Sequence, residues 1–232
     1  MPRRSDDRAT TRSSARLSRE GIVAAAVALA DREGLDGMSM RRLAQQLGAD
    51  PMSIYYHLKD KNALVEAMAD AVVAEIAPVP PVPGEPWTDR LRAIIMAARH
   101  AMLRHPWAAG LLAGRPAPTP ATIDHVERVL AALREGGCSV ALSHHALHLL
   151  GSRLLGFSQD LFDDSPAVRP APEVAAAQAA AWATSHPHVA ELAGAVTHEG
   201  ALGGCDDDAE FAFALDVLLE GLERRRVAAT AV

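Results

Sequence analysis

Five prolines lie within nine residues, between Pro78 and Pro86, and they divide the chain into two parts. Proline has no backbone N–H, and its ring clashes with the preceding helical turn, so no helix continues through this stretch. The run therefore predicts a linker over residues 77–87. With 232 residues, of which 49% are hydrophobic, the chain is long and apolar enough to bury a sizeable core.

Composition favours an all-α fold. Aromatic residues make up only 4% of the chain, whereas the strands of β-sandwiches draw mainly on aromatic and β-branched side chains. The longest apolar run, from Gly21 to Ala30, is far shorter than the roughly 20 residues that span a bilayer, so we expect no membrane helix. Cys138 and Cys205 are too few for a disulfide framework and lack zinc-type spacing. We therefore expect a cytoplasmic protein without a cofactor.

The basic start of the chain and the apolar run that follows it also imitate a signal peptide. Two observations favour a retained segment instead. Glu20 directly precedes the apolar run, and the run has helical periodicity between a capping serine, Ser18, and a stop at Gly34.

Charge is distributed unevenly along the sequence. Residues 1–62 carry a net charge of +3 and residues 63–232 a net charge of −9, and both lysines of the chain, Lys59 and Lys61, lie in the basic part. A basic head on an acidic body suits a polyanion such as DNA, although a basic tail on an acidic domain is the alternative. Residues 1–17 have almost no apolar side chains and are expected to form a flexible arm.

Capping residues predict four helices before the linker. Ser18, Ser39 and Asp50 can accept hydrogen bonds from exposed backbone N–H groups, while Gly48 can end a helix. The expected helices cover residues 19–33, 40–46, 51–58 and 60–76, within a DNA-binding domain at 18–76. After the linker, apolar periodicity and helix stops predict a second domain at 88–232. Its expected helices are 88–104, 106–113, 120–135, 139–162, 173–184 and 208–226.

Residues 39–58 have the pattern of a helix-turn-helix, since two short amphipathic helices flank a turn at Gly48. The outward side of the second helix would carry hydroxyl, imidazole and thioether groups, which suit base edges and thymine methyls in a major groove. These residues are Met52, Ser53, Tyr55, Tyr56 and His57. Four flanking residues are placed to hold phosphates, namely Ser39, Arg41, Lys59 and Lys61. A plain packing unit of two helices is the alternative.

The segments Arg42–Gly48 and Ser53–Leu64 resemble the N-terminal domain of TetR-family transcriptional repressors, and the resemblance extends over residues 18–76. It implies a homodimer that places two heads in successive major grooves of operator DNA, and an effector that changes their spacing. The family positions that touch DNA correspond to Ser39, Met40, Arg41, Pro51, Met52, Ser53, Tyr55, Tyr56, His57 and Lys61.

The distal part is similar to the tetracycline-repressor branch of this family, through segments such as His105-Pro106-Trp107 and Gly114-Arg115-Pro116. In that branch histidine and asparagine side chains hold a magnesium–drug chelate, whereas the matching positions here are Ala77, Ile94 and Leu112. The resemblance therefore implies a more apolar small-molecule effector. The candidate lining residues are Ile94, Ala98, Met102, Leu112, Leu130, Leu149 and Phe157, for each of which core packing is the alternative.

Surplus apolar side chains predict a surface for a second copy of the chain. The helix at 208–226 carries Phe213 and Val217 beside its main apolar stripe. A monomeric surface helix needs only one such stripe, so we expect a homodimer through helices 139–162 and 208–226. A fully buried central helix is the alternative.

His144 and His148 are four residues apart and would share a helix face, as a pair of metal ligands does. No third ligand stands nearby in sequence, so we expect no metal site, and a small metal-dependent helical enzyme is a weak alternative. The sequence favours a non-enzymatic DNA-binding regulator, a repressor released by an effector. A DNA-binding protein that senses no small molecule is the other alternative.

Overall fold

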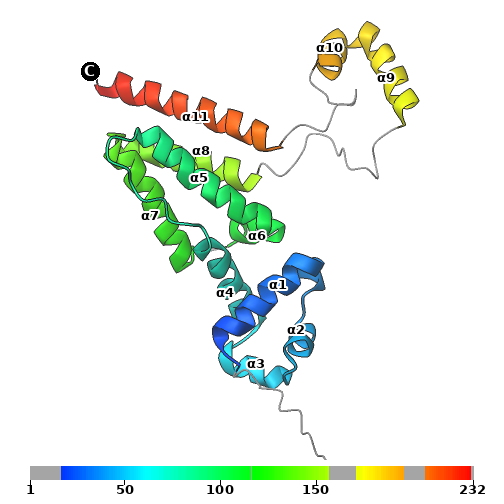
Figure 1. Cartoon of the computed structure of the whole chain (residues 1–232), viewed down its shortest axis with the longest axis vertical. Helices are drawn as coiled ribbons and strands as arrows, with labels where there is room; N and C mark the ends of the chain where they lie inside the picture. The colour runs from blue at the N-terminus through cyan, green and yellow to red at the C-terminus, as the bar shows by residue number, and fades with distance from the viewer. Residues whose placement is uncertain (1–16, 116, 157–170, 196–206, 231–232) are drawn as a thin grey trace, which may run out of the picture. The chain divides into compact units, whose positions relative to one another are not determined.

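The computed structural model describes residues 17–115, 117–156, 171–195 and 207–230 (Figure 1). All regular structure within these ranges is helical, with no strand, which confirms the all-α fold. Among the described helices, none combines the length and the hydropathy that a membrane crossing requires.

The chain divides into two compact units. The first contains the residues up to Glu75 together with Arg104–Ala121, and the second contains Ile76–Leu103 together with the residues from Thr122 onward. The segment at 104–121 therefore groups with the N-terminal residues, although it follows the proline-rich run in sequence. The domain boundaries expected from composition stay a prediction.

Five of the described helices pack together in the first unit. Helix α1 packs on α2 and α4, α2 packs on α3, and α6 packs on α1 and α4. The side chains of Ile22, Leu43, Ile54, Leu64 and Met68 are fully buried in this unit. The helices are α1 (Arg19–Gly37), α2 (Met40–Leu47), α3 (Pro51–His57), α4 (Lys61–Ala74) and α6 (Pro106–Ala113).

The predicted helix starts in this unit are confirmed. Ser18 Oγ accepts a hydrogen bond from the N–H of Gly21 at 3.0 Å, and Asp60 Oδ1 accepts one from the N–H of Ala63 at 2.8 Å. Gly34, the predicted stop of the first helix, has φ +72° and interrupts α1. The helical turn that follows extends α1 to Gly37, beyond the expected end at residue 33.

The second unit is built on the remaining helices, with Arg104 and Pro120–Ala121 at the ends of α5 and α7 belonging to the first unit. Helices α8 and α11 pack against each other, and α9 and α10 form a hairpin (Figure 1). The core contains Leu91, Ile95, Leu133 and Phe211. The helices are α5 (Trp87–Arg104), α7 (Pro120–Glu135), α8 (Val140–Gly156), α9 (Pro172–Ser185), α10 (Pro187–Ala195) and α11 (Asp207–Thr230).

Three of these helices differ from expectation. Helix α11 continues to Thr230, beyond the expected end at residue 226. Helix α8 is described as far as Gly156, so the expected continuation to residue 162 lies outside the described residues. Helix α10 was not expected, although Pro187 stands at its first position, where proline is well tolerated.

Polar contacts fasten α11 to α5 within the second unit. The indole N–H of Trp87 donates to the carboxylate of Glu223 at 3.1 Å. The buried Arg99 donates to Asp208 Oδ1 through Nε at 3.1 Å and Nη2 at 2.9 Å, and its guanidinium lies 4.3 Å from the ring centroid of Phe211. A buried guanidinium needs such partners, because an uncompensated buried charge is strongly destabilising.

Candidate nucleic-acid interface

Local capping shapes the helix-turn-helix in the first unit. Ser39 Oγ accepts from the N–H of Arg42 at 3.2 Å, and Asp50 Oδ1 accepts from the N–H of Met52 at 2.8 Å. Between these starts, Gly48 has φ +61° and ψ 32°, a left-handed conformation that only glycine adopts at little cost. The N–H of Ala49 then donates to the carbonyl of Ala44 at 3.0 Å and closes the turn. The predicted caps and the predicted turn are therefore confirmed.

The two helices bury one side and expose the other. Leu43 and Ile54 are fully buried and Leu58 is nearly so, which anchors α2 and α3 to the core. On the outer side of α3, Tyr56 is 88% exposed and Met52 is 72% exposed. Large apolar groups held in water at such exposure are costly unless a partner covers them, so this side of α3 has the character of a binding surface.

The candidate DNA-contacting residues all lie in the first unit. Among these candidates only Met40 and His57 are half-buried, and the others are exposed. The rings of Tyr56 and His57 meet edge to face with centroids 5.3 Å apart. The exposed residues are Ser39, Arg41, Pro51, Met52, Ser53, Tyr55, Tyr56, Lys59 and Lys61.

Three cations of this surface, Arg41, Lys59 and Lys61, form no ion pair with another residue that the structure describes. Arg42 differs, since it pairs with Glu33 at 2.5 Å and donates to the carbonyl of Gly37 at 3.1 Å. The first three can therefore offer their charge to phosphates, whereas Arg42 supports the fold of the head. Phosphate contacts of this kind set register and affinity but do not read sequence.

A network that holds α2 against α1 was not foreseen from the sequence. Gln46 Nε2 donates to the carbonyl of Ala25 at 3.2 Å, and Gln46 Oε1 accepts from Arg32 Nη2 at 2.5 Å. Arg32 also donates to the carbonyl of Ala28 at 2.8 Å. Because the partners are 14 and 21 residues from Gln46, no local pattern marks them.

The candidate effector-lining residues are distributed over both units. Ile94, Ala98 and Met102 are buried in α5, and Leu130 is partly buried against the core of the second unit. Leu112 lies in the first unit, and Leu149 is 48% exposed beside α11. Phe157 lies outside the described residues. The effector pocket therefore stays a prediction.

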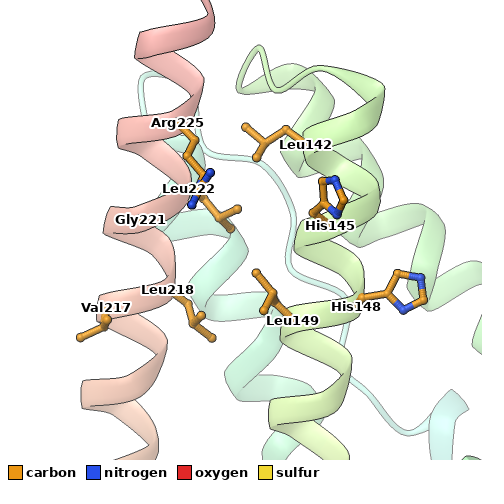
Figure 2. A pocket seen from close by; sticks show the side chains of 9 residues that line it. All are labelled: Leu142, His145, His148, Leu149, Val217, Leu218, Gly221, Leu222 and Arg225. Atoms are coloured by element: carbon orange, nitrogen blue, oxygen red, sulfur yellow. The ribbon is translucent and has the colours of Figure 1, made fainter.

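An apolar groove runs between α8 and α11, and its volume is about 560 Å³. Figure 2 shows Leu149 and Leu218 facing each other across it, with Leu142 and Leu222 nearer one end. The polar side chains that line it are His145, His148 and Arg225, so the lining contains no carboxylate. On α11, Phe213 is 67% exposed and Val217 is 49% exposed. The fully buried alternative for this helix is therefore wrong.

The histidines of α8 lie on its exposed face. The rings of His144 and His148 have centroids 4.6 Å apart, as the four-residue spacing predicts. Across the residues that the structure describes, no group of three His, Cys, Asp or Glu side chains is placed to hold a metal ion.

On α7, burial and the nearby Arg128 lower the pKa of His125 to about 4, so this imidazole is neutral at physiological pH.

A polar cluster that was not foreseen from the sequence lies where α6 begins. His105 is 7% exposed, and its Nδ1 and Nε2 lie 2.8 Å from Asp31 Oδ1 and 3.0 Å from Glu75 Oε2. Burial alone would lower the pKa of His105, but the hydrogen bonds to Asp31 and Glu75 outweigh it and raise the pKa. Asp31 also accepts from Trp107 Nε1 at 2.7 Å. We call these four residues the His105 cluster.

Comparisons with known proteins place both parts of the chain among regulators. The family described as bacterial regulatory proteins, tetR family, matches residues 22–68, and the tetracyclin repressor-like C-terminal domain matches residues 80–226.

Among curated relatives, an HTH-type transcriptional regulator of Saccharopolyspora erythraea is 39% identical over 52% of this chain and 51% of its own length. The class D tetracycline repressor of Escherichia coli is 35% identical over 61% of this chain and 65% of its own length, so these two matches span only part of each relative. The class G tetracycline repressor of Vibrio anguillarum is 31% identical over 93% of this chain and 98% of its own length.

The solved structure of apo ActR from Streptomyces coelicolor is similar along almost the whole chain. It has a TM-score of 0.75 and 30% identity, and the match covers 92% of this chain and 98% of ActR. ActR has also been solved in complex with actinorhodin, and that structure matches with a TM-score of 0.71 and 29% identity over 90% of this chain and 98% of ActR.

Proposed function

Since the chain belongs to the TetR family of bacterial regulatory proteins, we propose that it is a transcriptional repressor that leaves its operator when a small, largely apolar effector binds. One observation carries the DNA-binding part. A short capped helix, α3, is anchored from one side by Ile54 and holds Met52 and Tyr56 in solvent from the other.

In the proposed complex α3 lies in the major groove of double-stranded DNA. Tyr56 and Met52 approach base edges and thymine methyl groups, while Ser53 and His57 supply hydrogen-bonding groups beside them. The cations Arg41 and Lys61 contact phosphates and fix the register of the head. One set of side chains thus recognises the base sequence, and a different set positions the head on the DNA backbone.

The second part of the proposal is a homodimer through α8 and α11. The groove between these helices and the exposed Phe213 and Val217 support it, since a two-fold contact would cover them with the same surface of a second copy. The lining of the groove contains no carboxylate that could pair with Arg225 of a second copy, so the apolar residues of the groove supply the contact. A dimer then presents two heads to DNA, about 34 to 36 Å apart along the duplex.

The third part is a small-molecule effector held within the second unit. The complex of ActR with actinorhodin supports an effector for a chain of this architecture. The residues proposed to line the site are Ile94, Ala98, Met102 and Leu130, with Leu112, Leu149 and Phe157 as further candidates. By linkage, an effector that releases DNA must bind more tightly to the form that does not bind DNA.

A selection experiment tests this function. Full-length protein is mixed with random duplex DNA at low salt, retained fragments are sequenced, and a small-molecule collection is screened for release of the enriched fragment. We expect one enriched, near-palindromic sequence and at least one releasing compound. Enrichment without any releasing compound would support a DNA-binding protein that senses no small molecule. Absence of enrichment would contradict the proposal as a whole.

A further inference from the structure

The chain passes from one unit to the other at three places. At each of them a residue of α4, or the residue that caps it, either forms the junction or makes a hydrogen bond to it. The first crossing follows Glu75, which caps α4. The second precedes Arg104, whose Nη2 donates to Glu75 Oε2 at 3.2 Å. The third follows Ala121, whose N–H donates to Asp70 Oδ1 at 2.9 Å. The end of α4 is therefore the common anchor of all three crossings.

His105 connects this anchor to the rest of the head. Its ring bridges Glu75 at the end of α4 and Asp31 on α1, and it stands immediately before the first residue of α6. Ala108, in the first turn of α6, is fully buried, and α6 packs on α1 and α4 within the first unit. Helix α1 also contacts α2, through which the cluster is linked to the candidate DNA-binding surface.

The geometry favours a charged ring. A neutral imidazole has one N–H and one bare nitrogen, so it can donate to only one of two carboxylates. Asp31 Oδ1 lies 2.8 Å from Nδ1 and Glu75 Oε2 lies 3.0 Å from Nε2, so with both carboxylates ionised a protonated ring alone donates to both. The charged groups that face the ring are Asp31 from α1, Glu75 from the cap of α4, and Arg104, which shares Glu75 with it.

We propose that His105 is a positioning residue for operator binding: its protonated ring fastens α6 to α1 and to the end of α4, and operator affinity falls when the ring loses its proton. The effect on operator affinity rests on the proposed DNA-binding function. The attachment of α6 to α1 and α4 by the His105 ring does not, because all of these residues lie in the first unit.

The pH range in which the His105 cluster is intact follows from the pKa shifts of His105 and Glu75. The pKa of His105 is raised in the folded protein, so the contribution of its charge is present at low pH and is lost as the pH rises through that value. For Glu75, burial alone would raise the pKa, but hydrogen bonds from His105 and Arg104 lower it. The contribution of this carboxylate is therefore lost only as the pH falls through its lowered pKa. The cluster is intact between these two limits.

Hydrogen exchange of the full-length protein tests the fastening without DNA. Amide exchange in α6 is followed by mass spectrometry from pH 6 to pH 9, with correction for the intrinsic rate at each pH. Because charge-assisted hydrogen bonds are lost, we expect corrected exchange in α6 to be about tenfold faster at pH 9 than at pH 6. His105→Gln should exchange fast at both pH values, since a neutral amide cannot restore the charge.

Two further variants control this measurement. Glu75→Gln keeps the ring and its contact with Asp31, and the pH dependence of exchange in α6 should be weaker in this variant than in the wild type. It serves as the test variant if His105→Gln fails to fold. His188→Gln replaces a solvent-exposed histidine of α10 and should behave as the wild type does. Corrected α6 exchange that is the same at pH 6 and pH 9 in the wild type would overturn the proposal.

The operator part is tested on a duplex selected by the wild-type protein, at constant salt. Between pH 6 and pH 9 the wild type should lose about tenfold more affinity than His105→Gln. Any pH effect that arises at the DNA-contacting surface itself cancels in this comparison, because both proteins share that surface. Equal pH profiles would refute the link to operator binding. If no duplex is retained at any pH, both the proposed function and the proposed link of His105 to operator binding are refuted. The exchange data then still decide whether the ring fastens α6.

Discussion

Replacement of Lys61 by alanine tests whether the cations of the head contact phosphates. Lys61 is exposed at the start of α4 and forms no ion pair with another described residue, so its removal leaves the packing of the head unchanged. In the proposed dimer the substitution removes one phosphate contact from each of two heads. Each contact contributes about 0.9 to the slope of log affinity against log salt, so the slope should decrease by about 1.8.

This change in slope converts into a measurable ratio. Between 50 and 200 mM salt, the wild type should lose about twelvefold more affinity than Lys61→Ala. The assay is fluorescence anisotropy of a labelled duplex selected by the wild type, titrated at four or more salt concentrations. Arg224→Ala, on the exposed side of α11, makes the same change in net charge outside the head and should keep the wild-type slope. An unchanged slope in Lys61→Ala would refute the assignment of this lysine to a phosphate.

Three other substitutions, one of them with Gly110→Ala as its control, follow from the structure. Gly136→Ala would place a methyl group 2.7 Å from Trp87 Cβ, so urea denaturation should show a loss of about 1 to 3 kcal/mol; Gly110→Ala, which meets no atom within 4 Å, should not be destabilising. Gly48→Ala forces a side chain into φ +61° and should cost about 1 to 2 kcal/mol in the same measurement. Val217→Glu puts a carboxylate into the proposed dimer contact, and sedimentation velocity should then show monomers where the wild type sediments as a dimer.

Features that depend on local interactions could be predicted from the sequence. Ser39 and Asp50 cap helices through backbone groups two or three residues away, and Gly48 needs only its own conformational freedom. A pattern of residue types is sufficient for such contacts. The same holds for the buried and exposed sides of α3, because Ile54 and Tyr56 are separated by a fixed helical spacing.

The features that the sequence did not reveal depend on residues far apart in the chain. His105 meets Asp31 across 74 residues and Glu75 across 30, and only the packing of α6 on α1 and α4 brings them together. The grouping of residues 104–121 with the first unit has the same origin.

The reading surface on α3 is tested by the sequence preference of Tyr56→Ala. This ring lies almost entirely in solvent and should contact bases, so its loss should change which duplex is selected, whereas Lys61→Ala should weaken all duplexes alike. If the two variants change affinity and preference in the same way, reading and positioning are not separate tasks of this surface.

A base-resolution footprint of the full-length protein on its selected duplex shows whether a dimer reads DNA with α3. We expect two protected half-sites related by a two-fold axis, with centres about 10 base pairs apart and protected guanine N7 atoms in the major groove. Protection of a single half-site, or protection confined to the minor groove, would contradict a dimer that reads DNA with α3.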